Sequence, residues 1–357
     1  MRQWIAPAGS DFGLVLYVTK GLADVAGDEV TGLVPAAKVR LRQDRFLILD
    51  ASPGEAERLG AVTRTVDDIR LLVAGPARID GQPDFEELCR AAASTTVAAL
   101  SPTEDAWSVT MSARNPPWRR KPAWDPAPVI GARLYGADPA ATVRRAVDLR
   151  IQVDEDMAHI AVSLWPAPVG KRPGEPQLTW SGGLRPTVAA ALVRLGLAAI
   201  GPEAAADGLY DPFCGSGTIV AEAARAGLPV FGSDVSEQAV ALTRDRLAAQ
   251  GGFGPGELLR RVFVRDVHRG PDPRVTARLL IGNMPWGKQV KVAGRLALFD
   301  ATALLAAHTI GDGGGAVLLT THEEQLLPRL RRRGLTATAR RIGLLGQTPA
   351  IVTARPA

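Results

Sequence analysis

From about residue 180 onward, short apolar runs alternate with segments of helical periodicity. The strand candidates are 228–234, 258–266, 277–283 and 315–321, and the helix candidates are 186–199, 237–250, 294–310 and 322–334. Strands that alternate with helices predict an α/β domain with a doubly wound, mostly parallel sheet. Ligands of such sheets bind at the carboxyl ends of the strands, so the residues that follow each strand become the candidate site.

The first 100 residues or so alternate strand-like and helix-like signals, and residues 107–165 form a second unit. The strand or hairpin candidates are 14–19, 38–50, 107–114, 151–156 and 159–165, the helix candidates are 20–30 and 84–94, and 66–75 fits either. A stretch rich in proline and glycine at 166–177 marks a domain boundary. The predicted divisions are a domain over 1–100, a second over 101–168, a linker at 169–183 and the α/β domain over 184–357.

The composition is that of an ordinary globular protein, with 357 residues, 46% hydrophobic and 22% charged. Cys89 and Cys214 are far apart and outside any CxxC pair, which argues against a disulfide framework and a structural metal site and fits the cytoplasm. No signal-peptide pattern and no apolar stretch of about 18 residues is present, so we expect no membrane association. The net charge of +5 is compatible with a polyanionic partner.

The stretch DPFCGSGT (211–218) follows the first strand of the α/β domain and opens a helix. Glycines let the backbone approach a ligand closely, and a helix N-terminus offers N–H groups to an anion such as a carboxylate. A dinucleotide fingerprint requires Gly or Ala at position 220, where this chain has Val220. A tight turn without a ligand is the alternative. The candidate cofactor contacts here are Asp211, Pro212, Cys214, Gly215, Ser216, Gly217 and Thr218, with the Cys214 thiol as a small filler.

Acidic residues end the next two strands. Asp234 can accept hydrogen bonds from both hydroxyls of a ribose, or act as a helix N-cap, and the two roles are compatible. Asp266 can accept from an adenine amine, or be a solvated turn residue. Val235 and Val267, which follow them, complete the predicted cofactor contacts. Three strand-end acids indicate a nucleoside with a carboxylate-bearing tail and no phosphate, which fits S-adenosyl-L-methionine. The absence of a GxxxxGK[ST] loop argues against ATP or GTP.

The strand candidate 277–283 ends at Asn283, and Met284, Pro285 and Trp286 follow it. The Asn283 side-chain oxygen and the Met284 backbone carbonyl can accept both hydrogens of an exocyclic amine. Pro285 stiffens the loop, and Trp286 offers a ring for stacking. Two acceptors position the weakly nucleophilic amine toward an electrophilic methyl group. The alternative is a strand-end turn with a core tryptophan. We expect His268 to be a surface residue rather than a general base.

These motifs resemble those of Rossmann-like methyltransferases that modify exocyclic amines. The matching segments are DPFCGSGT, GSDVSEQAV (232–240), the strand that ends at Asp266, and NMPWG (283–287). LRPTVAAALVRL (184–195) resembles the Leu-Arg-Pro helix of the THUMP-domain tRNA guanine-N2-methyltransferases. The resemblance implies that S-adenosyl-L-methionine is the methyl donor and that Arg185 lies close to its methionine end.

The N-terminal half resembles the same family. KGLADVAGDEV (20–30) is similar to the opening helix of its ferredoxin-like domain, and RTVDDIRLLVA (64–74) is loosely similar to a later part. The stretch from WSVTMSAR (107–114) to HIAVSLW (159–165) resembles a THUMP domain, including Val147-Asp148-Leu149. The resemblance implies α+β structure for this half, with a ferredoxin-like domain over 1–100 and a THUMP-like RNA-binding domain over 101–168 that shares elements with it.

The implied activity is methylation of the N2 amine of a guanosine in tRNA, held by residues 283–286. The family usually has Asn-Pro-Pro or Asn-Leu-Pro followed by Tyr or Phe, so Met284 and Trp286 are departures. The proline-rich segment 115–128 leaves the RNA target open. The candidate phosphate contacts are Arg119, Arg120, Lys121, Arg329, Arg331, Arg332 and Arg333, although such runs also occur on solvated faces. We expect a monomer.

Two other functions remain open at this point. The first is methylation of a guanine N2 in rRNA or of an adenine N6 in a nucleic acid. The second is RNA binding by a chain whose methyltransferase domain has decayed, against which the intact Gly215, Gly217, Asp234 and Asn283 argue.

Overall fold

The structure, a computed structural model, describes residues 11–94, 107–114, 116, 147–165, 168–171, 183–285, 294–311 and 313–357. The chain divides into two compact units. The first comprises Met1–Val18 and Gly27–Lys171, and the second comprises Thr19–Ala26 and Arg172–Ala357. The described strands form two seven-stranded sheets, one in each unit.

The first unit is built on a mostly antiparallel sheet. Across it the strands are β2 (Lys38–Gln43), β3 (Phe46–Ala51), β1 (Phe12–Val18), β4 (Val66–Arg78), β7 (Met157–Ser163), β6 (Val147–Asp154) and β5 (Trp107–Arg114). Only β5 and β6 pair in parallel. The helices are α1 (Ala23–Leu33), whose residues from Gly27 onward belong to this unit, α2 (Pro53–Val62) and α3 (Gln82–Ser94), followed by the short η1 (Val169–Lys171).

The hairpin predicted at 38–50 is confirmed as β2 and β3, and the ambiguous segment 66–75 is part of β4. One continuous sheet carries strands from both predicted N-terminal domains, so the division into ferredoxin-like and THUMP-like parts stays a prediction. Glu29 shows how a buried carboxylate fixes a loop here: it is 4% exposed and accepts hydrogen bonds from the backbone N–H groups of Arg64 and Thr65. These bonds hold the connection between α2 and β4.

The second unit contains the predicted doubly wound sheet. Across it the strands are β10 (Val262–Val264), β9 (Val230–Asp234), β8 (Leu209–Asp211), β11 (Leu279–Asn283), β12 (Gly315–Thr320), β14 (Ala350–Pro356) and β13 (Leu335–Arg341). The five strands from β10 to β12 are parallel, and β14 is antiparallel to both of its neighbours.

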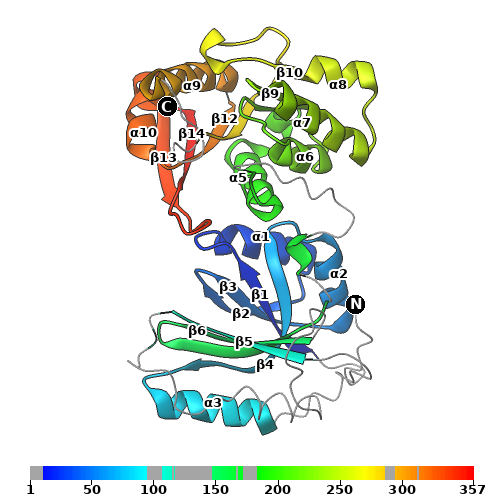
Figure 1. Cartoon of the computed structure of the whole chain (residues 1–357), viewed down its shortest axis with the longest axis vertical. Helices are drawn as coiled ribbons and strands as arrows, with labels where there is room; N and C mark the ends of the chain where they lie inside the picture. Colours follow the sequence, from blue (N-terminus) through cyan, green and yellow to red (C-terminus); the bar gives the residue numbers. More distant parts are fainter. Residues whose placement is uncertain are drawn as a thin grey trace. The chain divides into compact units, whose positions relative to one another are not determined.

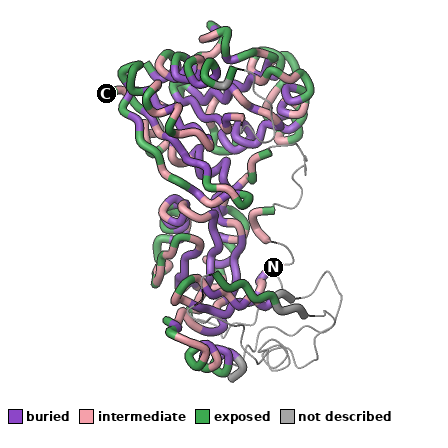
Figure 2. Tube along the Cα trace, turned by 60° about the vertical axis from the view of Figure 1, so that its left-hand side comes forward, coloured by how far each residue is buried: buried purple, intermediate pink, exposed green. Residues whose placement is uncertain are grey.

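Helices cover both faces of this sheet (Figure 1). The α-helices are α5 (Pro186–Ala205), α6 (Thr218–Arg225), α7 (Glu237–Gln250), α8 (Pro255–Arg261), α9 (Arg295–Ile310) and α10 (Glu323–Arg332), and η2 (Val267–Arg269) is a short 3-10 helix. Alternate strand residues supply the two cores. Leu209 packs in the cluster that includes α5, α6 and α7, whereas Tyr210 packs in the cluster that includes α9 and α10. In Figure 2 the inner segments of this unit are mostly buried, and most of its exposed residues lie on the outer segments.

Two features of this unit differ from the sequence prediction. The strand expected at 258–266 begins later and is shorter: α8 ends at Arg261, and β10 is only three residues long. Pro255 at the first turn and the ion pair between Glu257 and Arg261, four residues apart, favour the helix. The antiparallel pair β13 and β14 was not expected, because its position depends on pairing with the distant β12. None of the helices in the described ranges combines the length and apolar composition that crossing a bilayer requires.

Candidate active site

The predicted site residues gather at one edge of the second sheet. The strands β10, β9, β8 and β11 are adjacent and parallel, so the loops that follow them leave from the same edge. Asp211, Asp234 and Asn283 are the last residues of their strands, and Asp266 follows β10 by two residues. The fold therefore brings together the four segments that the sequence singled out separately.

The glycine loop adopts a conformation that requires its glycines. Gly215 and Gly217 have φ values of 51° and 77°, in the left-handed region that residues with a Cβ rarely adopt. A Cβ added at Gly217 would also lie 2.9 Å from the Thr243 Oγ1 atom. The Gly217 N–H donates to the Cys214 carbonyl at 2.7 Å, and α6 begins at the next residue. Gly217 is therefore required both by its backbone conformation and by its close packing against α7.

Two polar residues of α7 hold this loop, and sequence reasoning missed both. Thr243 Oγ1 donates to the Gly215 carbonyl at 2.8 Å, and Arg246 Nε donates to the Ser216 carbonyl at 2.7 Å. Both side chains are buried, and they lie three residues apart on the same face of the helix. Polar residues at this spacing on the packed side of a helix were the available sequence signal.

Asp234 connects the end of β9 to the glycine loop. Its Oδ2 accepts from the Gly215 N–H and its Oδ1 from the Ser236 N–H, each at 3.0 Å. The N-cap of α7 is Ser236 rather than Asp234. A carboxylate oxygen has two lone pairs, so both oxygens retain capacity for ribose hydroxyls. Two exposed apolar side chains lie nearby: Val235 is 66% exposed, and Val264 of β10, the register partner of Asp234, is 47% exposed. Sequence reasoning included Val235 but missed Val264.

Asp211 lies beneath the loop rather than on its surface. The residue is 1% exposed, and its Oδ1 accepts from the Phe213 N–H at 2.9 Å. Burial raises the pKa of this carboxyl to about 8, with a smaller contribution from the charge of Asp234. The carboxyl is therefore protonated at neutral pH. Asp211 shapes the turn that leads into the glycine loop.

Asp266 stands at the third strand end with one carboxylate oxygen engaged. Its Oδ1 accepts from the backbone N–H of His268 at 2.9 Å and lies 2.7 Å from the His268 Nδ1. The His268 backbone bond lowers the pKa of this carboxyl. Among the described residues no donor contacts its Oδ2, and the side chain is 48% exposed. Val267 differs, because its side chain packs in the core, so a ligand contact there must use backbone atoms. His268 is exposed, as predicted.

In the fourth candidate segment, residues 283–286, the hydrogen bonding between β11 and β12 continues for one residue beyond Asn283. Asn283 ends β11, and the Met284 N–H donates to the Leu319 carbonyl of β12 at 3.0 Å. The Met284 side chain is 1% exposed and belongs to the core, so it does not line a surface site. Met284, which departs from the family pattern, therefore changes the packing of the core rather than the lining of a surface site. Pro285 is half-buried, and Trp286 lies outside the described residues.

Comparisons with known proteins agree with this geometry. The sequence profile of the RMKL-like methyltransferase domain (UPF0020) matches residues 174–350. TrmN from Thermus thermophilus shares the fold with 26% identity, 97% of this chain and 100% of that chain covered, and a TM-score of 0.72. No curated protein sequence matches the chain significantly.

Residues 174–350 form an S-adenosylmethionine-dependent methyltransferase domain. Two further structures share the fold of the whole chain. SMU.472, solved in complex with SAH, is 15% identical, with 97% of this chain and 98% of that chain covered and a TM-score of 0.70. A predicted N6-adenine-specific DNA methylase from Listeria monocytogenes is 18% identical, with 96% of each chain covered and a TM-score of 0.70.

The cofactor of the methyltransferase domain is S-adenosyl-L-methionine. The residues at the carboxyl edge fit it chemically. Asp234 offers acceptors, and Val235 offers an exposed apolar surface. In the part of the chain that the structure describes, no group of three or more His, Cys, Asp or Glu side chains is arranged to hold a metal ion.

The remaining predicted contacts of the methyltransferase domain lie elsewhere. Arg185 is the N-cap residue of α5 and is exposed; its Nη2 donates to Thr19 Oγ1 at 3.0 Å. Arg331, Arg332 and Arg333 are exposed at the end of α10, where the Arg331 Nη2 donates to the Ala337 carbonyl at 3.1 Å. Arg329 instead pairs with Asp300. Arg119, Arg120 and Lys121 lie outside the described residues.

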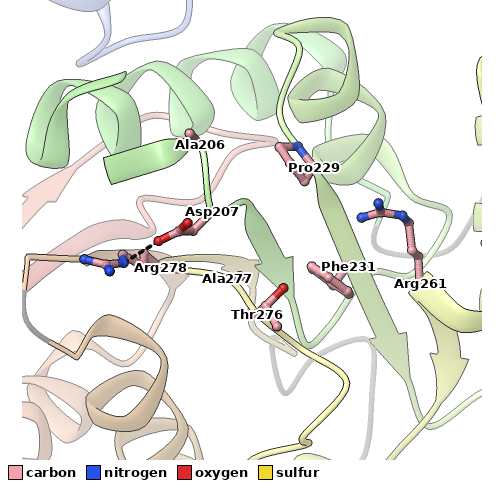
Figure 3. Close-up of a pocket in the computed structure, with 8 residues that line it drawn as sticks. All are labelled: Ala206, Asp207, Pro229, Phe231, Arg261, Thr276, Ala277 and Arg278. Carbon is pink, nitrogen blue, oxygen red and sulfur yellow. Dashed lines mark ion pairs between the residues drawn. The ribbon is translucent and has the colours of Figure 1, made fainter. Parts of the chain in front are cut away.

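A pocket of about 580 Å³ opens at the opposite edge of the sheet (Figure 3). Its lining residues are Ala206, Asp207, Pro229, Phe231, Arg261, Thr276, Ala277 and Arg278. Most of them immediately precede β8, β9, β10 or β11, so they mark the amino ends of the strands. Arg278 pairs with Asp207 on one side of the pocket, and Arg261 pairs with Glu257 on the other. This pocket is therefore separate from the strand-end acids.

Proposed function

We propose that the protein methylates the exocyclic N2 amine of a guanosine in tRNA. The observation that carries the proposal is the placement of Asn283 at the end of β11, with Pro285 just beyond it, next to β8 and its glycine loop. This neighbourhood allows an amine held by the Asn283 loop to face a methyl group held by the glycine loop. The whole-chain similarity to TrmN, a tRNA methyltransferase, supports a tRNA substrate.

Three groups hold the cofactor in this proposal. The N-terminus of α6 and the glycine loop bind the carboxylate of the methionine part, close to Arg185. Asp234 accepts from the ribose hydroxyls, and Val235 packs against the adenine. Asp266 accepts from the adenine amine through its Oδ2. Residues 211–218 form the turn and glycine loop that position these contacts.

Asn283 and its neighbours hold the target base. The Asn283 side-chain oxygen and the Met284 carbonyl accept the two hydrogens of the N2 amine, while Pro285 and Trp286 pack against the base. S-adenosyl-L-methionine supplies an electrophilic methyl group: the N2 lone pair forms the new N–C bond, the C–S pair returns to sulfur, and one N2 proton passes to solvent. The two acceptors keep the lone pair aimed at the methyl carbon, which is catalysis by positioning and electrostatics. A stacked base must be flipped out to reach these groups.

The RNA is bound over a larger surface in this proposal. The ferredoxin-like and THUMP-like parts, residues 1–100 and 101–168, contact the tRNA outside the target nucleotide. Arg331, Arg332 and Arg333 are exposed cations that suit phosphate contacts, as are Arg119, Arg120 and Lys121 in the sequence. Phosphate contacts position an RNA without reading its sequence.

The test is nucleoside mass spectrometry of tRNA incubated with the protein and S-adenosyl-L-methionine that carries a labelled methyl group. We expect label in N2-methylguanosine, and digestion into fragments then locates the modified position. Label in methyladenosine would keep the cofactor and replace the base. Label found only when rRNA is offered would replace the RNA class. The absence of label in either RNA would favour an RNA-binding protein whose methyltransferase domain has lost activity.

A further inference from the structure

Arg265 occupies the centre of the loop that carries Asp266. The residue directly follows β10, and its backbone N–H donates to the Asp234 carbonyl at 2.9 Å, which anchors it to the end of β9. Its side chain is only 16% exposed. The loop then makes the single turn of η2, reverses at Gly270, which has a φ of 69°, and returns to Asp272. Short loops of this kind need partners for their carbonyl groups.

The Arg265 guanidinium supplies those partners. Its Nη2 donates to the carbonyls of Arg269, Gly270 and Pro271 at 3.3, 3.0 and 2.9 Å. Its Nη1 lies 2.9 Å from the Asp272 Oδ2. One planar cation therefore contacts four consecutive residues of the returning chain. An ammonium group cannot reproduce this, because it lacks the fixed fork of five N–H donors.

A second arginine contacts the same acid from the other side and provides an internal comparison. Arg274 donates to Asp272 through Nε at 2.9 Å and Nη2 at 2.7 Å, and its guanidinium lies 3.8 Å from the centre of the Phe263 ring. These bonds to Arg274, followed by the Arg265 charge, lower the pKa of Asp272 to about 2. No hydrogen bond from Arg274 to the carbonyls of residues 269–271 is present among the described residues. Among the side-chain contacts of the described residues, the one that ties Asp272 to the body of the loop is that of Arg265.

The loop matters because Asp266 is the N-cap residue of η2, whose Val267 side chain packs in the core. Asp266 has no regular strand neighbour, and its Oδ1 is bonded only within the loop, to His268. The direction of its Oδ2 therefore depends on how η2 is held. Arg269 and Gly270 close η2 by donating to the Asp266 and Val267 carbonyls, each at 3.0 Å. Their own carbonyls are the ones that Arg265 binds.

We propose that Arg265 is a positioning residue that aims Asp266 at the adenine amine of S-adenosyl-L-methionine. The inference rests on the proposed role of Asp266 in cofactor binding. Arg265 itself does not touch the cofactor. It sets the specificity for an adenine by fixing the one acceptor that reads the amine, whereas Asp234 and the glycine loop hold the ribose and the methionine tail.

The test compares two ligands by isothermal titration calorimetry on the full chain. S-adenosyl-L-homocysteine carries the adenine amine, and S-inosyl-L-homocysteine replaces it with a carbonyl. We expect Arg265→Gln to weaken S-adenosyl-L-homocysteine binding roughly tenfold and S-inosyl-L-homocysteine binding less than about twofold. Asp266→Asn should change the ratio of the two affinities in the same direction, and the double variant should add little to either single one.

Arg274→Gln is the matched control, since it removes an arginine from the same acid but leaves the loop carbonyls bound. It should change both affinities by less than about twofold. Arg265→Lys keeps the charge, and it should behave like Arg265→Gln, because the fork rather than the charge is required. It also serves as the test if Arg265→Gln does not fold.

Three results would overturn the proposal. Equal weakening of both ligands by Arg265→Gln would assign the residue to general stability of the domain. Unchanged binding of both ligands in Arg265→Gln or Arg265→Lys would show that the loop holds without the guanidinium. Additive losses in the double variant would separate Arg265 from Asp266. A wild-type chain that binds neither ligand would contradict the cofactor site itself, which is a different result.

Discussion

The two edges of the methyltransferase sheet offer opposite kinds of surface. The amino edge has the open pocket of about 580 Å³, but its charged side chains are engaged in ion pairs. The carboxyl edge has Asp234, Asp266 and Asn283 at or just beyond the ends of parallel strands, beside a loop in which Gly215 and Gly217 have positive φ. In this domain, the functional groups gathered at one sheet edge therefore indicate the ligand site better than the volume of a pocket does. The following predictions test it.

The largest effect is expected at Asn283. Replacing it with Ala removes the acceptor that holds the target amine, so we expect methyl transfer to RNA to fall about 100- to 1000-fold. Cofactor affinity should stay nearly unchanged, because Asn283 lies on the base side of the site. The measurements are single-turnover methylation and calorimetric binding of S-adenosyl-L-homocysteine. Equal loss of both would show that this loop belongs to the cofactor site.

A pair of identical substitutions compares the two edges directly. Asp234→Ala at the carboxyl edge should weaken S-adenosyl-L-homocysteine binding about 10- to 100-fold, because two charge-assisted acceptors for the ribose are lost. Asp207→Ala at the amino edge should leave this affinity unchanged. Calorimetry on both variants decides the matter. A stronger effect at Asp207 would move the cofactor to the amino-edge pocket.

The buried carboxyl of Asp211 predicts a pH dependence of stability. Burial raises its pKa to about 8 in the folded chain, whereas an unfolded aspartate titrates near about 3.9. Between these values the folded state holds a proton that the unfolded state has lost, so stability falls as pH rises, by up to about 1.4 kcal/mol per pH unit. Asp211→Asn should remove this fall.

The measurement is the free energy of unfolding in urea at several pH values between 4.5 and 8.5. Parallel curves for the wild type and Asp211→Asn would show that the carboxyl ionises normally in the folded chain. In that case the charged form, rather than the protonated one, would hold the Phe213 N–H.

The smallest effect is expected for two glycine substitutions, which together separate the strain of a positive φ from the clash of an added Cβ. Gly217 and Gly227 both have positive φ, 77° and 81°, but only at Gly217 would a Cβ meet neighbouring atoms. We expect Gly217→Ala to lower the free energy of unfolding by about 1–3 kcal/mol, because backbone strain and a steric clash add up. Gly227→Ala should lower it by about 1–2 kcal/mol, because only backbone strain acts there. Gly217→Ala should also weaken cofactor binding, whereas Gly227→Ala should not. Equal effects on binding would show that the glycine loop tolerates a side chain.

The periodicity of the sequence was enough to predict the sheet and the strand ends. Apolar runs are local, and parallel strands align their carboxyl ends, so Asp211, Asp234, Asp266 and Asn283 could be placed at one edge before any coordinates were known. The segment 258–266 was misread because Leu258 and Val262 fit a strand as well as a helix end. The pair β13 and β14 was missed because its register comes from β12, far away in the chain.

The sequence by itself determined the class of fold, the order of the strand-end motifs and the chemistry that those motifs suit. Only the tertiary structure decided which atoms support them. Thr243, Arg246 and Arg265 hold the loops through bonds to backbone carbonyls, and the sequence does not show which carbonyls these side chains bind. The burial of Asp211 and of the Met284 side chain likewise follows from packing between distant elements. The physical reason is that periodicity reports the face of an element, whereas burial and backbone bonds depend on what that face meets.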